Sequence, residues 1–128
     1  MAMALVHAEG GTLLVRASGD ITYPEVERIL DEMARALQVH GAVNLLADCR
    51  GIRSTISAAE LRKTAAELKP FINQGVRHFA LVTDSTFMYG IGRMFGALVE
   101  LTGAHLSVFA DVESAQRWLD ENQPRPRL

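Results

Sequence analysis

The chain has 128 residues, which is the length of one domain and long enough to bury a substantial core. Hydrophobic residues make up 48% of it and charged residues 22%, so the composition predicts a soluble globular protein. The 13 Lys and Arg residues are outnumbered by 15 Asp and Glu residues, which argues against a nucleic-acid partner. No window approaches the roughly 20 continuous apolar residues that a membrane-spanning helix needs.

The N-terminal segment and the cysteine content bear on the compartment of the protein. The N-terminal segment, MAMALVHAEGG, has neither a basic start nor an apolar core, so we expect no secretory signal. The single cysteine, Cys49, excludes an internal disulfide and a multi-cysteine metal site, and it fits a reducing cytoplasm. Residues 123–128, QPRPRL, are expected to be a disordered tail, and residues 1–122 a single domain.

The first predicted elements are a hairpin and a helix. Residues 5–9 and 12–18 are β-compatible runs around Gly10-Gly11, a spacing typical of an antiparallel hairpin, and apolar residues alternate along the second run. Residues 22–25, TYPE, fit a capping box with proline in the first helical turn, and Gly41 stands where a C-terminal cap belongs. The apolar residues between them have helical spacing: Val26, Ile29, Leu30, Met33 and Leu37.

The middle of the chain predicts a strand, a loop and a second helix. Residues 43–48, VNLLAD, are typical of a buried strand, and residues 49–56 of a polar loop. Residues 57–60, SAAE, form a second capping box. The helix that follows has a narrow apolar stripe and is expected to end at Pro70, after which Phe71 and Ile72 return to the core.

The C-terminal half predicts two more buried strands, at residues 78–83 and 106–110, each followed by a helix. With the hairpin, this order predicts an α/β fold: three strand-helix units after the hairpin, and about five strands in a mixed sheet covered by about four helices. Asp48, Asp84 and Asp111 follow the three strands, at the sheet edge where ligands bind in such folds. We expect them to be helix N-caps rather than a metal or acid/base site.

Four segments carry a family resemblance: GDIT at 19–22, NLLADCRGI at 44–52, RHFALVTD at 77–84 and VFADVESAQRWL at 108–119. In this order they resemble the SpoIIAA-like family, a branch close to the STAS domains of anti-sigma-factor antagonists and sulphate transporters and to CRAL-TRIO lipid-binding domains. The resemblance covers roughly residues 11–120. It implies a small bacterial protein whose suggested role is to bind a lipophilic ligand.

The same resemblance places Ser57 where anti-sigma antagonists carry a regulatory phosphoserine. Ser57 begins a predicted helix, whose free N–H groups favour a phosphate. The neighbours Ile56, Ala58 and Ala59 lack the acid and the glycine of that motif, however. A plain N-cap is the main interpretation, and a phosphosite is the alternative.

The best candidate for function is the stretch of residues 84–103, which is nearly uncharged yet interrupted by three glycines. Glycine inside a helix costs about 1 kcal/mol relative to alanine, so these positions need a reason in packing or in a close contact. On a helical projection, Gly92 and Gly96 form a side-chain-free strip on the shoulder of an apolar arc, and the opposite side carries Tyr89, Arg93 and Glu100. The arc consists of Phe87, Met88, Ile91, Met94, Phe95, Leu98, Val99 and Leu101.

Our first hypothesis is a non-enzymatic binding module that holds a small lipophilic ligand beside the helix at residues 85–102. Methionine and aromatic side chains adapt to variable ligands, although a well-filled core is the alternative use for them. The expected ligand-binding residues are Phe87, Met88, Ile91, Gly92, Met94, Phe95 and Gly96.

A second hypothesis is a protein-interaction module, either a homodimer or a STAS-like regulatory partner, because Gly92 and Gly96 let another backbone approach closely. Cofactors are not expected. The glycines lie inside a helix rather than in the turn after a strand, which argues against a dinucleotide site. His78 and His105 stand near the starts of strands, where they can be neighbours, but two histidines alone are weak evidence for zinc.

Two further candidate sites lie at the carboxyl end of the predicted sheet. Cys49 is expected to be a small buried hydrophobe, and a reactive thiol beside Arg50 is the alternative. Arg50 and Arg53, with Ser54 and Thr55, are a weak candidate for binding an anionic head group, against a solvated loop. No GxSxG, HExxH or Walker-type motif occurs, so we expect no enzyme.

Overall fold

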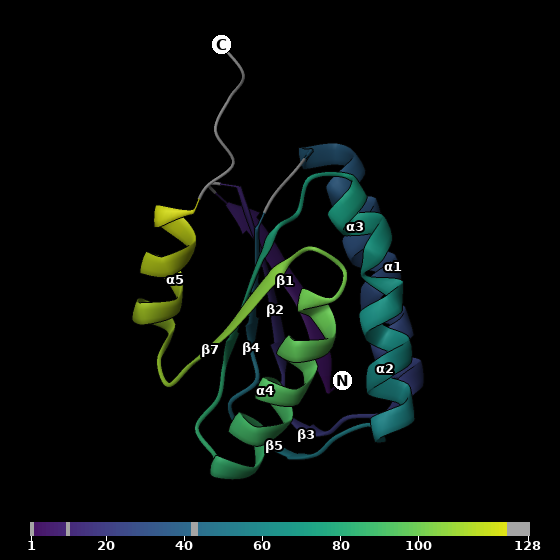
Figure 1. Ribbon diagram of the computed structural model, residues 1–128, viewed down its shortest axis with the longest axis vertical. Helices are drawn as coiled ribbons and strands as arrows, with labels where there is room; N and C mark the ends of the chain where they lie inside the picture. Colours follow the sequence, from purple (N-terminus) through teal and green to yellow (C-terminus); the bar gives the residue numbers. More distant parts are fainter. Residues whose placement is uncertain (1, 10, 42–43, 123–128) are drawn as a thin grey trace.

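The computed structural model describes residues 2–9, 11–41 and 44–122. One mixed sheet runs through the middle of the molecule, with helices on both faces (Figure 1). The predicted α/β fold is confirmed. The strands of the main sheet are β1 (Met3–Glu9), β2 (Thr12–Ala17), β4 (Asn44–Asp48), β6 (His78–Val82) and β7 (His105–Phe109). The helices are α1 (Tyr23–His40), α2 (Ala58–Glu67), α3 (Lys69–Asn73), α4 (Thr86–Glu100) and α5 (Val112–Glu121).

The order of strands in the main sheet is β1-β2-β4-β6-β7. The predicted hairpin is confirmed, because β1 and β2 pair antiparallel, with Glu9 opposite Thr12. Each later strand pairs parallel with the one before it, so β7 lies at one end of the sheet. The carboxyl ends of the parallel strands therefore meet at one edge of the sheet.

Two unequal helical layers cover the sheet. Helices α1 to α4 lie on one face, and α5 alone lies on the other (Figure 1). Alternate residues of the central strands serve the two layers: Leu45 packs with the α1 side and Leu46 with the α5 side. The predicted inward face of β2 is confirmed, since Leu13, Val15 and Ala17 are buried.

The first capping box was only half right. Thr22 is the N-cap of α1 and Pro24 lies in its first turn, but the Thr22 side chain makes no capping hydrogen bond. Glu25 instead accepts a hydrogen bond from the Met3 N–H at 3.0 Å and pairs with Arg28, so it ties α1 to β1. The C-terminal cap at Gly41, with φ +78°, is as predicted.

The region predicted as a polar loop at residues 49–56 contains a strand. β5 (Ile52–Ser54) pairs parallel with β3 (Gly19–Asp20) in a second, two-stranded sheet. Such short pairs carry too few residues for a period to show in the sequence. The side chains of Arg53 and Ser54 both bond Asp20, which joins the two segments.

The second capping box is confirmed in full, and the helix stop after it is revised. The Glu60 N–H donates to Ser57 Oγ at 3.1 Å, and the Ser57 N–H donates to the Glu60 carboxylate at 2.9 Å. The predicted helix ends before Pro70, and a second short helix, α3, contains this proline. It lies in the first turn of α3, where its missing N–H is tolerated, and Phe71 is buried as expected.

Two expectations about strand ends and strand burial were wrong. Asp111 caps α5, but α4 is capped by Ser85 rather than Asp84, and Asp48 is ion-paired with Arg50. The strand β7 is only half-buried, because it is the end strand of the sheet.

The predicted tail at residues 123–128 lies outside the described residues. Among the helices that are described, none has both the length and the apolar character required to cross a bilayer.

Candidate functional site

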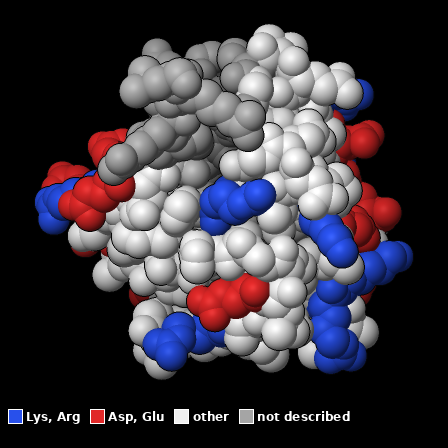
Figure 2. Space-filling model, turned by 45° about the horizontal axis from the view of Figure 1, so that its top comes forward, with Lys and Arg blue, Asp and Glu red and all other residues white. Residues whose placement is uncertain are grey.

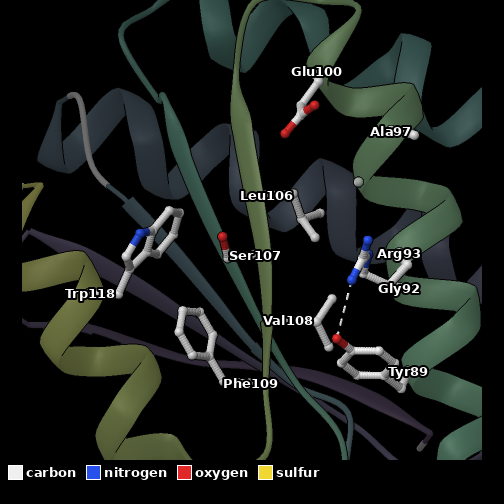
Figure 3. Close-up of a pocket in the computed structure, with 11 residues that line it drawn as sticks. Tyr89, Gly92, Arg93, Ala97, Glu100, Leu106, Ser107, Val108, Phe109 and Trp118 are labelled. Carbon is white, nitrogen blue, oxygen red and sulfur yellow. Dashed lines mark hydrogen bonds between the residues drawn. The ribbon is translucent and has the colours of Figure 1, made fainter.

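A groove of about 490 Å³ runs along β7 between α4 and α5 (Figure 3). We call it the edge groove. Helix α4 lies on one side of the strand, and Trp118 of α5 lies on the other. Its lining residues come from α4, β7 and α5: Tyr89, Gly92, Arg93, Gly96, Ala97, Glu100, Leu106, Ser107, Val108, Phe109 and Trp118.

The glycine strip forms the contact between α4 and β7. A Cβ atom added to Gly92 would lie 3.0 Å from Val108 Cγ2, and one added to Gly96 would lie 3.5 Å from the Leu106 carbonyl oxygen. Both glycines are buried. The backbone that the strip admits is therefore that of β7 in the same chain, and the glycines allow α4 to lie close against the edge strand.

Charged and aromatic side chains line the two sides of the edge groove. On the α4 side, Arg93 donates to the Tyr89 hydroxyl at 3.3 Å, and Glu100 extends into the groove farther along the helix (Figure 3). On the α5 side, the rings of Phe109 and Trp118 have centroids 5.6 Å apart. One wall is thus polar with both charge signs, and the other is aromatic.

The histidine pair that the sequence suggested lies beside this aromatic wall. His78 and His105 are opposite each other in neighbouring strands, with ring centroids 5.5 Å apart, and His78 packs edge-on to Trp118 at 5.2 Å. Burial, followed by the nearby His105, lowers the pKa of His78 from its usual 6.5. Within the described residues, no group of three or more His, Cys, Asp or Glu side chains is placed to hold a metal ion.

The seven predicted ligand residues do not line one pocket. Gly92 and Gly96 face β7, and Met88 is buried. Phe87 and Met94 are 53% and 41% exposed. The buried face of α4 is therefore rotated toward the glycines relative to the predicted apolar arc, because the helix packs onto β7 as well as onto the core.

A second space, the internal cavity, lies under the helices on the α1 side of the sheet. It measures about 130 Å³, and Phe95 reaches it from α4. Nearly every lining residue is apolar: Met3, Val15, Val26, Ile29, Leu30, Met33, Leu45, Ala47, Thr64, Leu68, Phe79, Ala80, Leu81, Phe95 and Leu106. A lining of this kind favours an apolar occupant over water.

The two arginines proposed for anion binding are both occupied by carboxylates. Arg50 forms a bidentate pair with Asp48, at 2.8 and 2.7 Å, which lowers the pKa of Asp48 below its usual 3.8. Arg53 pairs with Asp20 at 3.3 Å. Their charges are largely balanced by these partners, so the arrangement gives the anion hypothesis no support.

Two other candidates also have structural roles. Ser57 is exposed, and its hydroxyl and N–H are both bonded to Glu60, whose carboxylate would repel a phosphate there. Its phosphorylation stays a prediction. Cys49 is buried, and burial raises the pKa of its thiol to about 12, so the thiol is not a nucleophile at neutral pH.

The groove-lining Tyr89, Arg93, Glu100 and Trp118 were not among the predicted site residues. Tyr89, Arg93 and Glu100 belong to the side of the helix that the projection predicts to be polar. Figure 2 shows the molecule tilted with its top forward: a basic and an acidic patch lie in the otherwise uncharged middle, and further charged side chains gather toward the sides, where Figure 1 places α5 and α1 to α3. The sequence offers one signal for this groove: the strand at residues 105–109 is the last in a series of parallel strands, so it can lie at an end of the sheet.

Comparison with known proteins agrees with this architecture. The model of the SpoIIAA-like family matches residues 12–120. The chain belongs to the SpoIIAA-like family. The sequence of this SpoIIAA-like protein matches no curated protein.

Two solved structures resemble this SpoIIAA-like protein in fold. One is an uncharacterized protein of the DUF3478 family with a SpoIIAA-like fold from Shewanella loihica PV-4, with 16% identity, a TM-score of 0.67, and coverage of 92% of this chain and 93% of that chain. The other is the Bacillus cell fate determinant SpoIIAA in its phosphorylated form, with 15% identity, a TM-score of 0.62, and coverage of 91% and 99%. At these identities the likeness concerns the fold alone.

Proposed function

We propose that this SpoIIAA-like protein is a non-enzymatic binding module that holds a small lipophilic ligand between α4 and the sheet. The internal cavity carries this proposal. It measures about 130 Å³ and is lined almost wholly by apolar side chains, with Phe95 as the contribution of α4. Apolar cavities of roughly 150 Å³ in proteins stay dry and take up molecules of the size of benzene.

The groups nearest to the carboxyl end of the sheet support a role without catalysis. Asp48 is neutralised by Arg50, and the Cys49 thiol is buried with its pKa raised to about 12. Neither group has the near-neutral pKa that general acid-base or nucleophilic catalysis needs. A cytoplasmic location also fits a single thiol that is kept buried and unpaired.

The proposal is tested first by what the protein carries from the cell. Native mass spectrometry of the purified protein, followed by organic extraction, is expected to show an apolar adduct.

In parallel, calorimetry with toluene measures whether the cavity takes up an aromatic ring. Filling the cavity by Ala47→Leu is expected to weaken toluene binding by about tenfold or more while the protein stays folded, because the added methyl groups occupy the same space.

The matched control is Ala66→Leu, the same change at an exposed position of α2 that does not line the cavity. It should bind toluene like the wild type. A wild-type protein that carries no adduct and takes up no toluene would contradict the ligand proposal, as would equal losses in the two variants.

A further inference from the structure

In the part of the chain that the structure describes, β7 is the last strand of the sheet, and no strand pairs with its outer edge. His105 N–H donates to the Arg77 carbonyl at 2.8 Å, and Thr83 N–H donates to the Phe109 carbonyl at 3.0 Å. Along a parallel ladder alternate residues bond to the neighbouring strand, so Leu106 and Val108 direct both their N–H and C=O groups away from β6. Both residues line the edge groove.

The edge carries none of the devices by which proteins protect a free strand. Residues 105–109 read HLSVF, without Pro, Lys or Arg, and the pairing with β6 continues without a bulge. The edge groove leaves room beside the strand, because the flanking side chains of α4 and α5 stand on its two sides (Figure 3). A sheet edge of this kind accepts an additional strand.

We propose that the added strand is β7 of a second copy of this chain, paired antiparallel about a two-fold axis at Ser107. In this register, Leu106 of one copy lies opposite Val108 of the other, so the outward groups on both sides meet and form about four hydrogen bonds. A shift by one residue would place outward groups against inward ones. The interface is isologous, and it joins the two main sheets into one.

The side chains are compatible with this register. Ser107 meets its own copy at the axis, where opposed side chains come closest and a small residue is needed. Leu106 and Val108 make an apolar pair on the α4 side. On the α5 side, His105 lies opposite Phe109.

The positions of the charged residues on α4 favour a second copy of this chain as the partner over an unrelated strand. Helix α4 runs antiparallel to β7, with Gly96 beside Leu106 and Gly92 beside Val108. With a rise of about 1.5 Å per residue in the helix and 3.3 Å in the strand, Tyr89 lies toward the Phe109 end and Glu100 toward the His105 end. The backbone of Arg93 lies near the level of Ser107, and its guanidinium bonds the Tyr89 hydroxyl. The two-fold axis exchanges these ends.

Each Glu100 therefore comes to the level of Tyr89 of the other copy, whose hydroxyl accepts a hydrogen bond from the Arg93 guanidinium, twice per dimer. Both charged side chains are exposed in the single chain and line the edge groove. Opposite charges at both ends of a self-complementary strand favour the antiparallel two-fold arrangement and disfavour like-charged alternatives. The inference does not depend on the internal cavity, which lies on the other side of α4.

Charge reversal tests this inference directly in sedimentation velocity experiments over a range of concentrations. The wild type is expected to be dimeric. Arg93→Glu alone places two acids together at each contact, and Glu100→Arg alone places two bases together, so each variant should dimerise about tenfold or more weakly. An equimolar mixture of the two variants should regain a dimer, because both contacts of the mixed pair are then attractive.

The matched control is Glu27→Arg, the same change at an exposed position of α1, which should leave the dimer unchanged. Ser107→Lys provides a second test at the axis, where two ammonium groups would oppose each other. This variant should sediment as a monomer and should keep the circular dichroism spectrum of a folded protein. A wild-type monomer at high micromolar concentration overturns the inference. So does a dimer that ignores these changes, or a mixture that stays monomeric, even if the edge binds another peptide.

Discussion

His78 shows how much of the character of a single residue depends on partners that are remote in sequence. It begins β6, stacks on His105 of β7 and packs against Trp118 of α5. The pairing of the two histidines could be expected from their places at strand starts, and it is confirmed. The aromatic partner could not be expected, because it depends on where α5 crosses the sheet.

The lowered pKa of His78 predicts a pH dependence of stability. Below the usual 6.5 the unfolded chain binds a proton at this residue more readily than the folded chain does, because burial and His105 disfavour the charged ring. The free energy of unfolding contributed by His78 is therefore highest above 6.5 and falls as the pH is lowered through 6.5 to the folded pKa.

Urea unfolding at pH 7.5 and pH 5, followed by the fluorescence of the single tryptophan, measures this effect. His78→Gln cannot titrate in this range, so its stability should fall less than that of the wild type between the two pH values. Equal falls in both proteins would assign the pH dependence to other groups.

At the scale of elements, the period of the sequence predicted where helices and strands lie better than which way they face. The capping box at Ser57 and the glycine cap at Gly41 are local patterns, and both are confirmed. The half-buried state of β7 was missed because a short apolar run looks the same in the middle of a sheet and at its edge. Strand order arises from contacts that are distant in sequence, so periodicity does not report it.

Helix α4 illustrates the same limit for orientation. The apolar arc included Phe87, Met94 and Leu101, yet the structure leaves these residues exposed and buries Gly92 and Gly96. Glycine counts as neither polar nor strongly apolar in a projection, so the face that packs on β7 carried little signal. The edge groove lies beside that face, and for this reason the candidate site was predicted only in part.

Because the buried face of α4 is rotated, truncating Met88 should destabilise the protein much more than truncating its neighbour Phe87. Met88 is 5% exposed, so Met88→Ala should destabilise the protein by about 2–4 kcal/mol. Phe87 is 53% exposed, so Phe87→Ala should change the free energy of unfolding by no more than about 0.5–1 kcal/mol. Urea unfolding of both variants compares the two values. Similar losses in both variants would support the originally predicted face.

At the scale of the whole molecule, the two helical layers depend on the sheet to different degrees. Four helices share one face, whereas α5 alone covers Leu46, Ala80 and Val82 on the other. The fold class followed from the order of elements, but this imbalance did not, since the side on which a helix packs depends on the handedness and length of each connection. The burial of that face therefore depends on how α5 is attached to the sheet.

Asn44 fastens the end of α5 to the centre of the sheet. Its side chain is completely buried at the start of β4, and its amide donates to the carbonyls of Leu119 at 3.3 Å and Asn122 at 3.4 Å. These carbonyls lie at the C-terminus of the helix, where intrahelical donors run out. Asn44→Ala leaves them buried without this donor, so it should lower the free energy of unfolding by about 1–3 kcal/mol.

Hydrogen exchange followed by mass spectrometry should show where the stability is lost. In Asn44→Ala, residues 112–121 are expected to lose protection before residues 23–40, because α1 is held by contacts that the substitution does not touch. Asn73→Ala, at an exposed position of α3, serves as the control and should leave both segments unchanged. Uniform loss of protection would mean that Asn44 supports the sheet as a whole, and an unchanged free energy of unfolding would contradict its role in attaching α5.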